Sequence, residues 1–186
     1  MREVKVSTVI SASCEDVFDL LEDFSRRPAF TDHYMKDFRL ARPNPCGEGA
    51  SARFLLDRRI FSERAELRIV ESDRPRRIVE EGRVGRRGRS TLSAVYELEP
   101  DADGGCRVSL STRSEPKTAV DRLRQRGAHR WVRHNTKKAL DRLRRLLEEP
   151  SDGPPQRVTV AGYERHTAPR FGDHVQGPQK TAAADG

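Results

Sequence analysis

Residues 117–149 read KTAVDRLRQRGAHRWVRHNTKKALDRLRRLLEE, a segment in which apolar side chains recur at helical spacing. This spacing places them on one stripe of an α-helix. The stripe consists of Val120, Leu123, Ala128, Trp131, Val132, Ala139, Leu140, Leu143, Leu146 and Leu147. We expect a helix of about 33 residues, which would be roughly 50 Å long. Gly127 is its weak point, because glycine costs a helix about 1 kcal/mol relative to alanine.

Segments typical of β-strands precede this helix and are separated by turns rich in Gly, Pro, Asp and Asn. They lie at residues 36–42, 50–61, 63–71, 78–84, 90–99 and 106–114. In several of them apolar and polar residues alternate, as around Leu92, Ala94 and Tyr96, so one face of the sheet is apolar. That face needs a cover, and the amphipathic helix is the element that can supply it.

The N-terminal part of the chain predicts one more strand and two short helices. Residues 3–12 are rich in β-branched side chains, as strands are. Ser13 can then cap a helix, because its hydroxyl can accept a hydrogen bond from an amide of the first turn. Pro28 ends or redirects this helix, and residues 29–34 predict a second short helical turn. The expected fold class is therefore α+β, with a curved antiparallel sheet of about six or seven strands around a long C-terminal helix.

One domain, at residues 1–150, accounts for all of these elements. Residues 151–186 are rich in Gly, Pro and Ala and have no sustained apolar period, so we expect a disordered polar tail. Within this tail, Val158–Val160 and Tyr163 could dock as a short segment.

Several classes of protein are disfavoured by composition. No apolar run approaches the roughly 18 residues of a membrane span, and the N-terminus lacks the apolar core of a signal peptide, so a cytoplasmic protein is expected. Cys14, Cys46 and Cys106 are widely separated and contain no Cys-x-x-Cys pair, so we interpret them as free thiols. The sequence indicates no metal site and no cofactor.

The net charge of +7 falls entirely on residues 117–149, since the regions on either side are neutral. The candidate basic surface consists of Arg122, Arg126, Arg130, Arg133, Lys137 and Lys138. Such a surface could contact an anionic membrane or nucleic acid. The alternative is that these residues form only the solvated side of an Arg-rich helix.

Three parts of the sequence resemble a known superfamily. The first is Ile10-x-Ala12 followed by Val17-Phe18-x-Leu20-Leu21-x-Asp23-Phe24-x-x-x-Pro28, which resembles a first strand and helix pair. The second is the turn at residues 73–78, and the third is the hairpin formed by Tyr96–Pro100 and Gly104–Val108. In their order and spacing they resemble the START-related polyketide cyclase/dehydrase superfamily, often called SRPBCC, over about residues 3–148.

This resemblance implies a helix-grip fold with a deep cavity between the sheet and the long helix. Members hold lipids, sterols, polyketides, quinones or plant hormones there. The superfamily has no universal catalytic motif, so the resemblance assigns no catalytic residue.

The candidate cavity residues lie on the faces expected to meet across the interior. They are Phe54, Leu56, Leu67, Ile69, Glu80, Leu92, Ala94, Tyr96, Val108, Leu110, Trp131, Val132 and Asn135. The alternative is that these side chains fill a solid core, because pattern alone does not distinguish a packed interior from a hollow one.

Catalytic chemistry is weakly indicated. Glu80 and Glu81 are neighbours in a strand, so one of them can point inward, where a buried carboxylate could act as an acid or base. The alternative is a partly exposed carboxylate that pairs with one of the many arginines. The leading hypothesis is a carrier, sensor or chaperone for a small hydrophobic molecule. A cyclase or dehydratase is the first alternative, and membrane or nucleic-acid binding through the basic helix is the second.

Overall fold

The computed structural model describes residues 3–58, 61–85, 90–116, 128–149 and 159–160. The elements are β1 (Val4–Ile10), α1 (Cys14–Glu22), α2 (Pro28–Thr31), β2 (Met35–Leu40), β3 (Ser51–Arg58), β4 (Phe61–Asp73), β5 (Arg77–Val84), β6 (Ser90–Pro100), β7 (Cys106–Glu115), α4 (Ala128–Glu148) and β8 (Thr159–Val160). Their order matches the order expected from the sequence.

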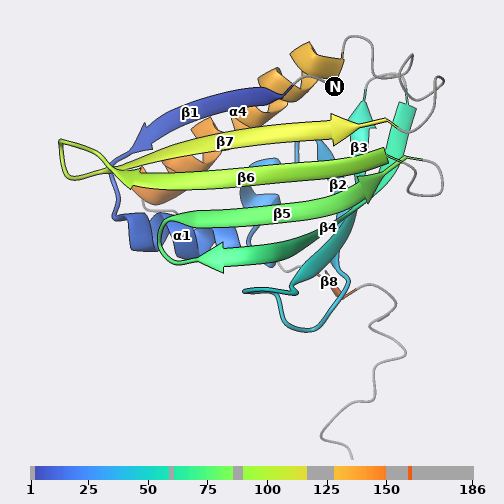
Figure 1. The fold of residues 1–186 in the computed structure, drawn as a ribbon, viewed down its shortest axis with the longest axis horizontal. Coiled ribbons are helices and arrows are strands. Elements are labelled where there is room, and N and C mark those ends of the chain that lie inside the picture. Colours follow the sequence, from blue (N-terminus) through green and yellow to red (C-terminus); the bar gives the residue numbers. More distant parts are fainter. Residues whose placement is uncertain (1–2, 59–60, 86–89, 117–127, 150–158, 161–186) are drawn as a thin grey trace, which may run out of the picture.

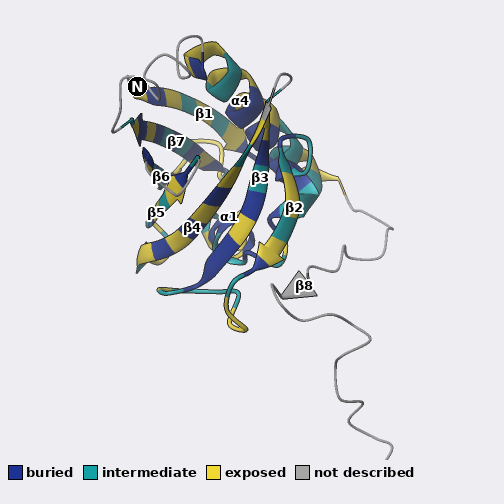
Figure 2. Cartoon of the chain, turned by 90° about the vertical axis from the view of Figure 1, so that its right-hand side faces the viewer, coloured by how far each residue is buried: buried dark blue, intermediate teal, exposed yellow. Residues whose placement is uncertain are grey.

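The strands form one sheet in the order β1-β7-β6-β5-β4-β3-β2-β8. Pairing is antiparallel from β1 to β2, and β8 adds to β2 in the parallel direction at Arg39 and Leu40. The sheet curls, and α4 lies along its concave side (Figure 1, Figure 2). This confirms the predicted helix-grip fold.

The helix α1 begins where the sequence predicts. The Ser13 hydroxyl accepts a hydrogen bond from the Asp16 amide at 3.1 Å, which satisfies one of the unpaired amides of the first turn. Its apolar face is fully buried, with Phe18 and Leu21 among the core residues. The cap and the amphipathic pattern together fix this helix against the sheet.

The described helix α4 covers 21 residues at the C-terminal end of the predicted long helix. Its side chains Ala139, Leu140 and Leu143 are buried, and the helix packs against β1. Residues 117–127, including the predicted weak point at Gly127, lie outside the described residues. In the tail, Thr159 and Val160 pair with β2, in agreement with the predicted docking of this segment. The other residues of the predicted disordered tail lie outside the described residues.

Strands β4 and β5 approach each other closely at Gly82. A Cβ atom placed on this residue would lie 1.9 Å from the Glu66 carbonyl oxygen, so only glycine fits. On β4, the register with β5 shifts between Ile69 and Glu71, which marks a bulge. These two features allow β4 and β5 to curve around the interior.

Candidate ligand-binding site

A cavity of about 70 Å³ lies between the concave face of the sheet and α4. Nine of its lining residues are predicted cavity residues: Leu56, Leu67, Glu80, Leu92, Ala94, Tyr96, Leu110, Trp131 and Val132. The interior is therefore mostly filled, with a small space remaining.

Four predicted cavity residues lie elsewhere. Phe54, Ile69 and Val108 are buried in the core and do not line the cavity. Asn135 is buried on α4, where its amide nitrogen donates a hydrogen bond to the Trp131 carbonyl oxygen at 2.8 Å. Asn135 thus satisfies the backbone of its own helix.

Other lining residues escaped the prediction, namely Tyr34, Met35, Arg58, Val84, Thr112, Arg113, Ser114 and Thr136. Thr112 and Ser114 share a strand face with Leu110, so alternation along β7 could have identified them. Tyr34 contacts Trp131 edge to face, with ring centroids 5.9 Å apart, across the space between the sheet and α4. No local pattern in the sequence indicates this contact.

A buried ion pair lies at one end of the cavity. Arg27, in the turn between α1 and α2, is 1% exposed and pairs with Glu80 of β5, which is 0% exposed. Arg27 also donates from Nη1 to the Tyr96 hydroxyl at 2.7 Å and from Nη2 to the Leu21 carbonyl at 2.8 Å. The sequence did not indicate Arg27 as an interior residue.

Aromatic rings surround the Arg27 guanidinium. It lies 5.0 Å from the ring centroid of Phe24, 5.6 Å from that of Phe30 and 5.4 Å from that of Tyr96. Cation–π attraction to these rings adds to the stabilisation by Glu80. The charge of Arg27 is therefore compensated inside the core.

Burial changes the protonation equilibria of this cluster. It raises the pKa of the Glu80 carboxyl above its usual value, while the Arg27 guanidinium opposes the rise. It also raises the pKa of Tyr96 to about 12. The Tyr96 hydroxyl therefore keeps its proton at neutral pH and can donate a hydrogen bond.

A second polar cluster joins α2 to α4. Arg142 forms an ion pair with Asp32 and donates to His33 Nδ1 at 3.2 Å. The His33 Nε2 atom lies 3.2 Å from the Asn135 carbonyl oxygen. With Nδ1 as acceptor and Nε2 as donor, this arrangement requires a neutral imidazole.

Protonation of His33 is expected to weaken the fold. Burial lowers the pKa of His33, and the charges of Lys138 and Arg142 lower it further. The Asn135 carbonyl and the Asp32 carboxylate raise it, but they do not cancel the decrease. The unfolded chain therefore binds this proton more readily than the folded chain. The stabilisation is complete above the unfolded pKa of about 6.5 and is lost as pH falls through the lower folded pKa, at most about 1.4 kcal/mol per pH unit.

The matched variant is His33→Gln, whose amide can keep both hydrogen bonds without titrating. Urea unfolding at several pH values between 7.5 and 5 should show a steeper loss of stability in the wild type than in the variant. Equal slopes for the two proteins would contradict this prediction.

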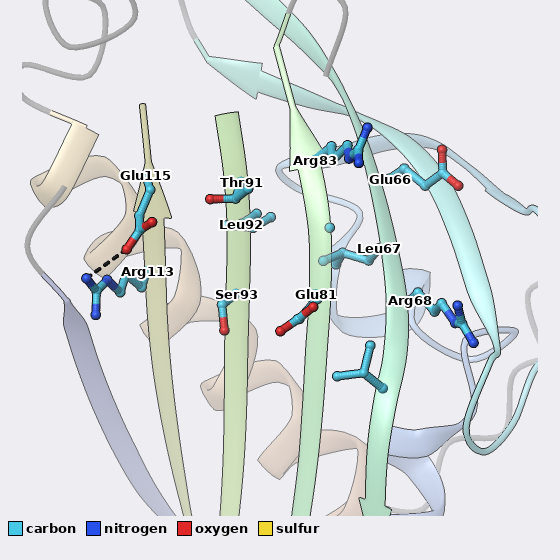
Figure 3. Close-up of a pocket in the computed structure, with 12 residues that line it drawn as sticks. Glu66, Leu67, Arg68, Glu81, Arg83, Thr91, Leu92, Ser93, Arg113 and Glu115 are labelled. Carbon is cyan, nitrogen blue, oxygen red and sulfur yellow. Dashed lines mark ion pairs between the residues drawn. The ribbon is translucent and has the colours of Figure 1, made fainter. Parts of the chain in front are cut away.

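A larger groove, of about 680 Å³, lies on the opposite face of the sheet (Figure 3). It is shallow and lined by charged side chains of both signs, and Arg113 and Glu115 form an ion pair across 2.7 Å at its border. Leu67 and Leu92 line both this groove and the cavity, at the point where Gly82 has no side chain. About half of the groove's lining surface is polar, whereas the lining of the smaller cavity is mostly apolar, so the cavity is the better candidate for an apolar ligand.

The basic residues of α4 are exposed. Arg130, Arg133, Lys137 and Lys138 all face solvent, and none of them pairs with a carboxylate of the described residues. Arg122 and Arg126 lie outside the described residues. Binding of a membrane or nucleic acid by this surface stays a prediction.

A curved antiparallel sheet closed by a C-terminal helix, with a cavity between them, defines the helix-grip class of proteins. The chain belongs to the family described as polyketide cyclase / dehydrase and lipid transport, whose model matches residues 1–148. This confirms the resemblance seen in the sequence.

Solved structures share the fold at low sequence identity. TTHA0849 from Thermus thermophilus is 18% identical with a TM-score of 0.63, and the match covers 80% of this chain and 99% of that one. The KanY protein is 16% identical with a TM-score of 0.66, covering 78% and 97%. The major latex-like protein 151 of Panax ginseng is 13% identical with a TM-score of 0.58, covering 80% and 97%. No curated protein matches the chain. None of the described helices is long and apolar enough to cross a membrane.

Proposed function

We propose that the protein binds a small hydrophobic molecule, or the leading end of a longer lipid-like one, in the cavity between the sheet and α4. The observation that carries this proposal is a partly open space between the sheet and α4 with mostly apolar walls and with Glu80 and Tyr96 on its lining. Ligand sites in proteins combine these two features. The family's description, which includes lipid transport, supports the same class of ligand.

The size of the cavity limits what can enter without rearrangement. A space of about 70 Å³ is well below the roughly 300 Å³ of a pocket for a drug-sized ligand. It suits a small molecule or one end of a longer one. Carriage or sensing of such a molecule is the role that we propose.

Filling the cavity from within is expected to abolish ligand retention. Ala94 is buried and lines the cavity, so Ala94→Leu places additional carbon atoms in the space that the ligand would occupy. Native mass spectrometry of the protein purified from its own source should show a bound small molecule in the wild type and a loss of at least about tenfold in occupancy in the variant.

The matched control is Ser93→Leu. Ser93 is the next residue on β6 and lines the groove on the opposite face. This variant adds similar bulk outside the cavity and should retain the molecule. Loss in Ser93→Leu with retention in Ala94→Leu would place the ligand in the groove and contradict the proposal.

An acid–base reaction on the bound molecule is a second candidate, favoured by the position of Glu80. Glu80 lines the cavity and has a raised pKa, whereas Glu81 is exposed on the outer face and His33 is held by α4. The ion pair with Arg27 makes Glu80 a poorer proton carrier. We therefore rank binding above catalysis.

A further inference from the structure

We propose that the cavity selects molecules whose buried end carries a neutral hydroxyl group, an alcohol or a phenol, and that this hydroxyl lies between Glu80 and Tyr96. The inference rests on the proposed function, because it names the chemical class of ligand for the same cavity.

The unpaired oxygen of Glu80 is the first observation. Glu80 is 0% exposed, and its Oε1 atom accepts the hydrogen bond from Arg27. Its Oε2 atom has no partner among the described residues. Buried carboxylate oxygens in native proteins are almost always hydrogen-bonded. Because Glu80 lines the cavity, a molecule bound there can supply the missing donor.

The hydroxyl of Tyr96 is the second observation. It accepts a hydrogen bond from Arg27 Nη1 at 2.7 Å, and no described residue accepts a bond from it. Tyr96 therefore offers a donor to the cavity while Glu80 offers an acceptor. The same guanidinium group holds both side chains, with Nη1 bound to the Tyr96 hydroxyl and Nη2 bound to Glu80 Oε1, so both polar groups belong to one buried cluster.

A hydroxyl group satisfies both partners at once, since it donates one hydrogen bond and accepts another. An ether or ketone could accept from Tyr96 but would leave Glu80 unpaired. A hydrocarbon would leave both unpaired.

Charge balance excludes ionic groups at this position. Arg27 already compensates Glu80, so an ammonium or carboxylate group on the ligand would add an uncompensated buried charge. Apolar side chains form much of the remaining lining, including Leu67, Ala94 and Leu110. The end of the ligand that lies beside Glu80 is therefore expected to be neutral.

Phenol and toluene provide the test, because they share size and shape and differ only in hydroxyl against methyl. Each is titrated into the methyl-labelled full chain and followed by NMR. The Ala94 and Leu110 methyl groups report on the cavity, and Val70, 39% exposed on the outer face, reports on the groove. We expect phenol to bind in the cavity with a Kd about tenfold lower than that of toluene.

Two variants assign the preference to its residues. Glu80→Gln replaces a carboxylate oxygen by a donor group and should bring the two Kd values within about threefold of each other. Tyr96→Phe keeps the Arg27–Glu80 pair. It should raise the Kd of phenol by about fivefold and leave the Kd of toluene unchanged. If Glu80→Gln fails to fold, the wild type and Tyr96→Phe still decide the question.

The outcomes separate this inference from the proposed function. Equal binding of phenol and toluene at Ala94 would overturn the hydroxyl preference and leave an apolar cavity site standing. A phenol preference that survives Glu80→Gln unchanged would also overturn it. Binding of neither probe at Ala94, or shifts confined to Val70, would overturn both.

Discussion

Replacing Arg27 by methionine is expected to lower the free energy of unfolding by about 3–5 kcal/mol, because Glu80 then remains as a buried charge without its counter-ion. The variant also leaves the Leu21 carbonyl and the Tyr96 hydroxyl without their donor. Urea unfolding at pH 7, followed by the fluorescence of Trp131, measures the loss. No other single change to a polar side chain of the described residues removes so many buried partners.

Removing both charges tests whether the unpaired buried charge causes the loss of stability. The double variant Arg27→Met/Glu80→Leu has no unpaired buried charge, so its free energy of unfolding should return to within about 2 kcal/mol of the wild type. Glu80→Leu alone should be destabilising, since it leaves Arg27 unpaired.

The matched control is Arg74→Met, which breaks the ion pair between Arg74 and Asp19. In this pair the two charged groups lie 2.6 Å apart, and the side chains of Arg74 and Asp19 are 54% and 49% exposed. Exposed pairs contribute about 0–1 kcal/mol, so this variant should be close to the wild type. Two outcomes would show that the buried ion pair does not cause the loss of stability. One is an equal free energy of unfolding for Arg27→Met and Arg74→Met, and the other is a double variant no more stable than the single variants.

The fold could be predicted because its determinants are local and repeated. Alternation along β6 and β7 and the amphipathic pattern of α4 fix which faces are buried, and the register then brings those faces together. The helix start at Ser13 follows from its side chain alone. Such features are visible in a few consecutive residues.

The site could be predicted only in part. Strand alternation allowed one residue of the pair Glu80 and Glu81 to point inward without deciding that it does, and Glu80 is buried. Its partner Arg27 lies 53 residues earlier, beside another arginine and before Pro28, where nothing local distinguishes an interior arginine from a surface one. How much of the interior is empty depends on how side chains from distant segments pack, and no periodic pattern encodes this volume.

Replacing Gly82 by alanine is expected to cost about 3 kcal/mol of the free energy of unfolding, by overpacking and loss of ladder hydrogen bonds. The added Cβ would lie 1.9 Å from the Glu66 carbonyl oxygen and 3.0 Å from Leu67 Cδ2. The backbone of β4 cannot yield as a flexible side chain would, so the two strands must separate. Urea unfolding measures the loss, and amide hydrogen exchange should localise it to β4 and β5.

The control for this change is Gly104→Asn in the turn between β6 and β7. Gly104 has a positive φ of 84°, which asparagine tolerates, and no atom lies within 4 Å of its added Cβ. This substitution should cost less than about 1 kcal/mol. Equal costs at the two positions would mean that loss of glycine itself, and not the approach of β4, causes the effect. A larger cost at Gly82 would instead identify the close approach of the β4 backbone as the cause of the lost stability.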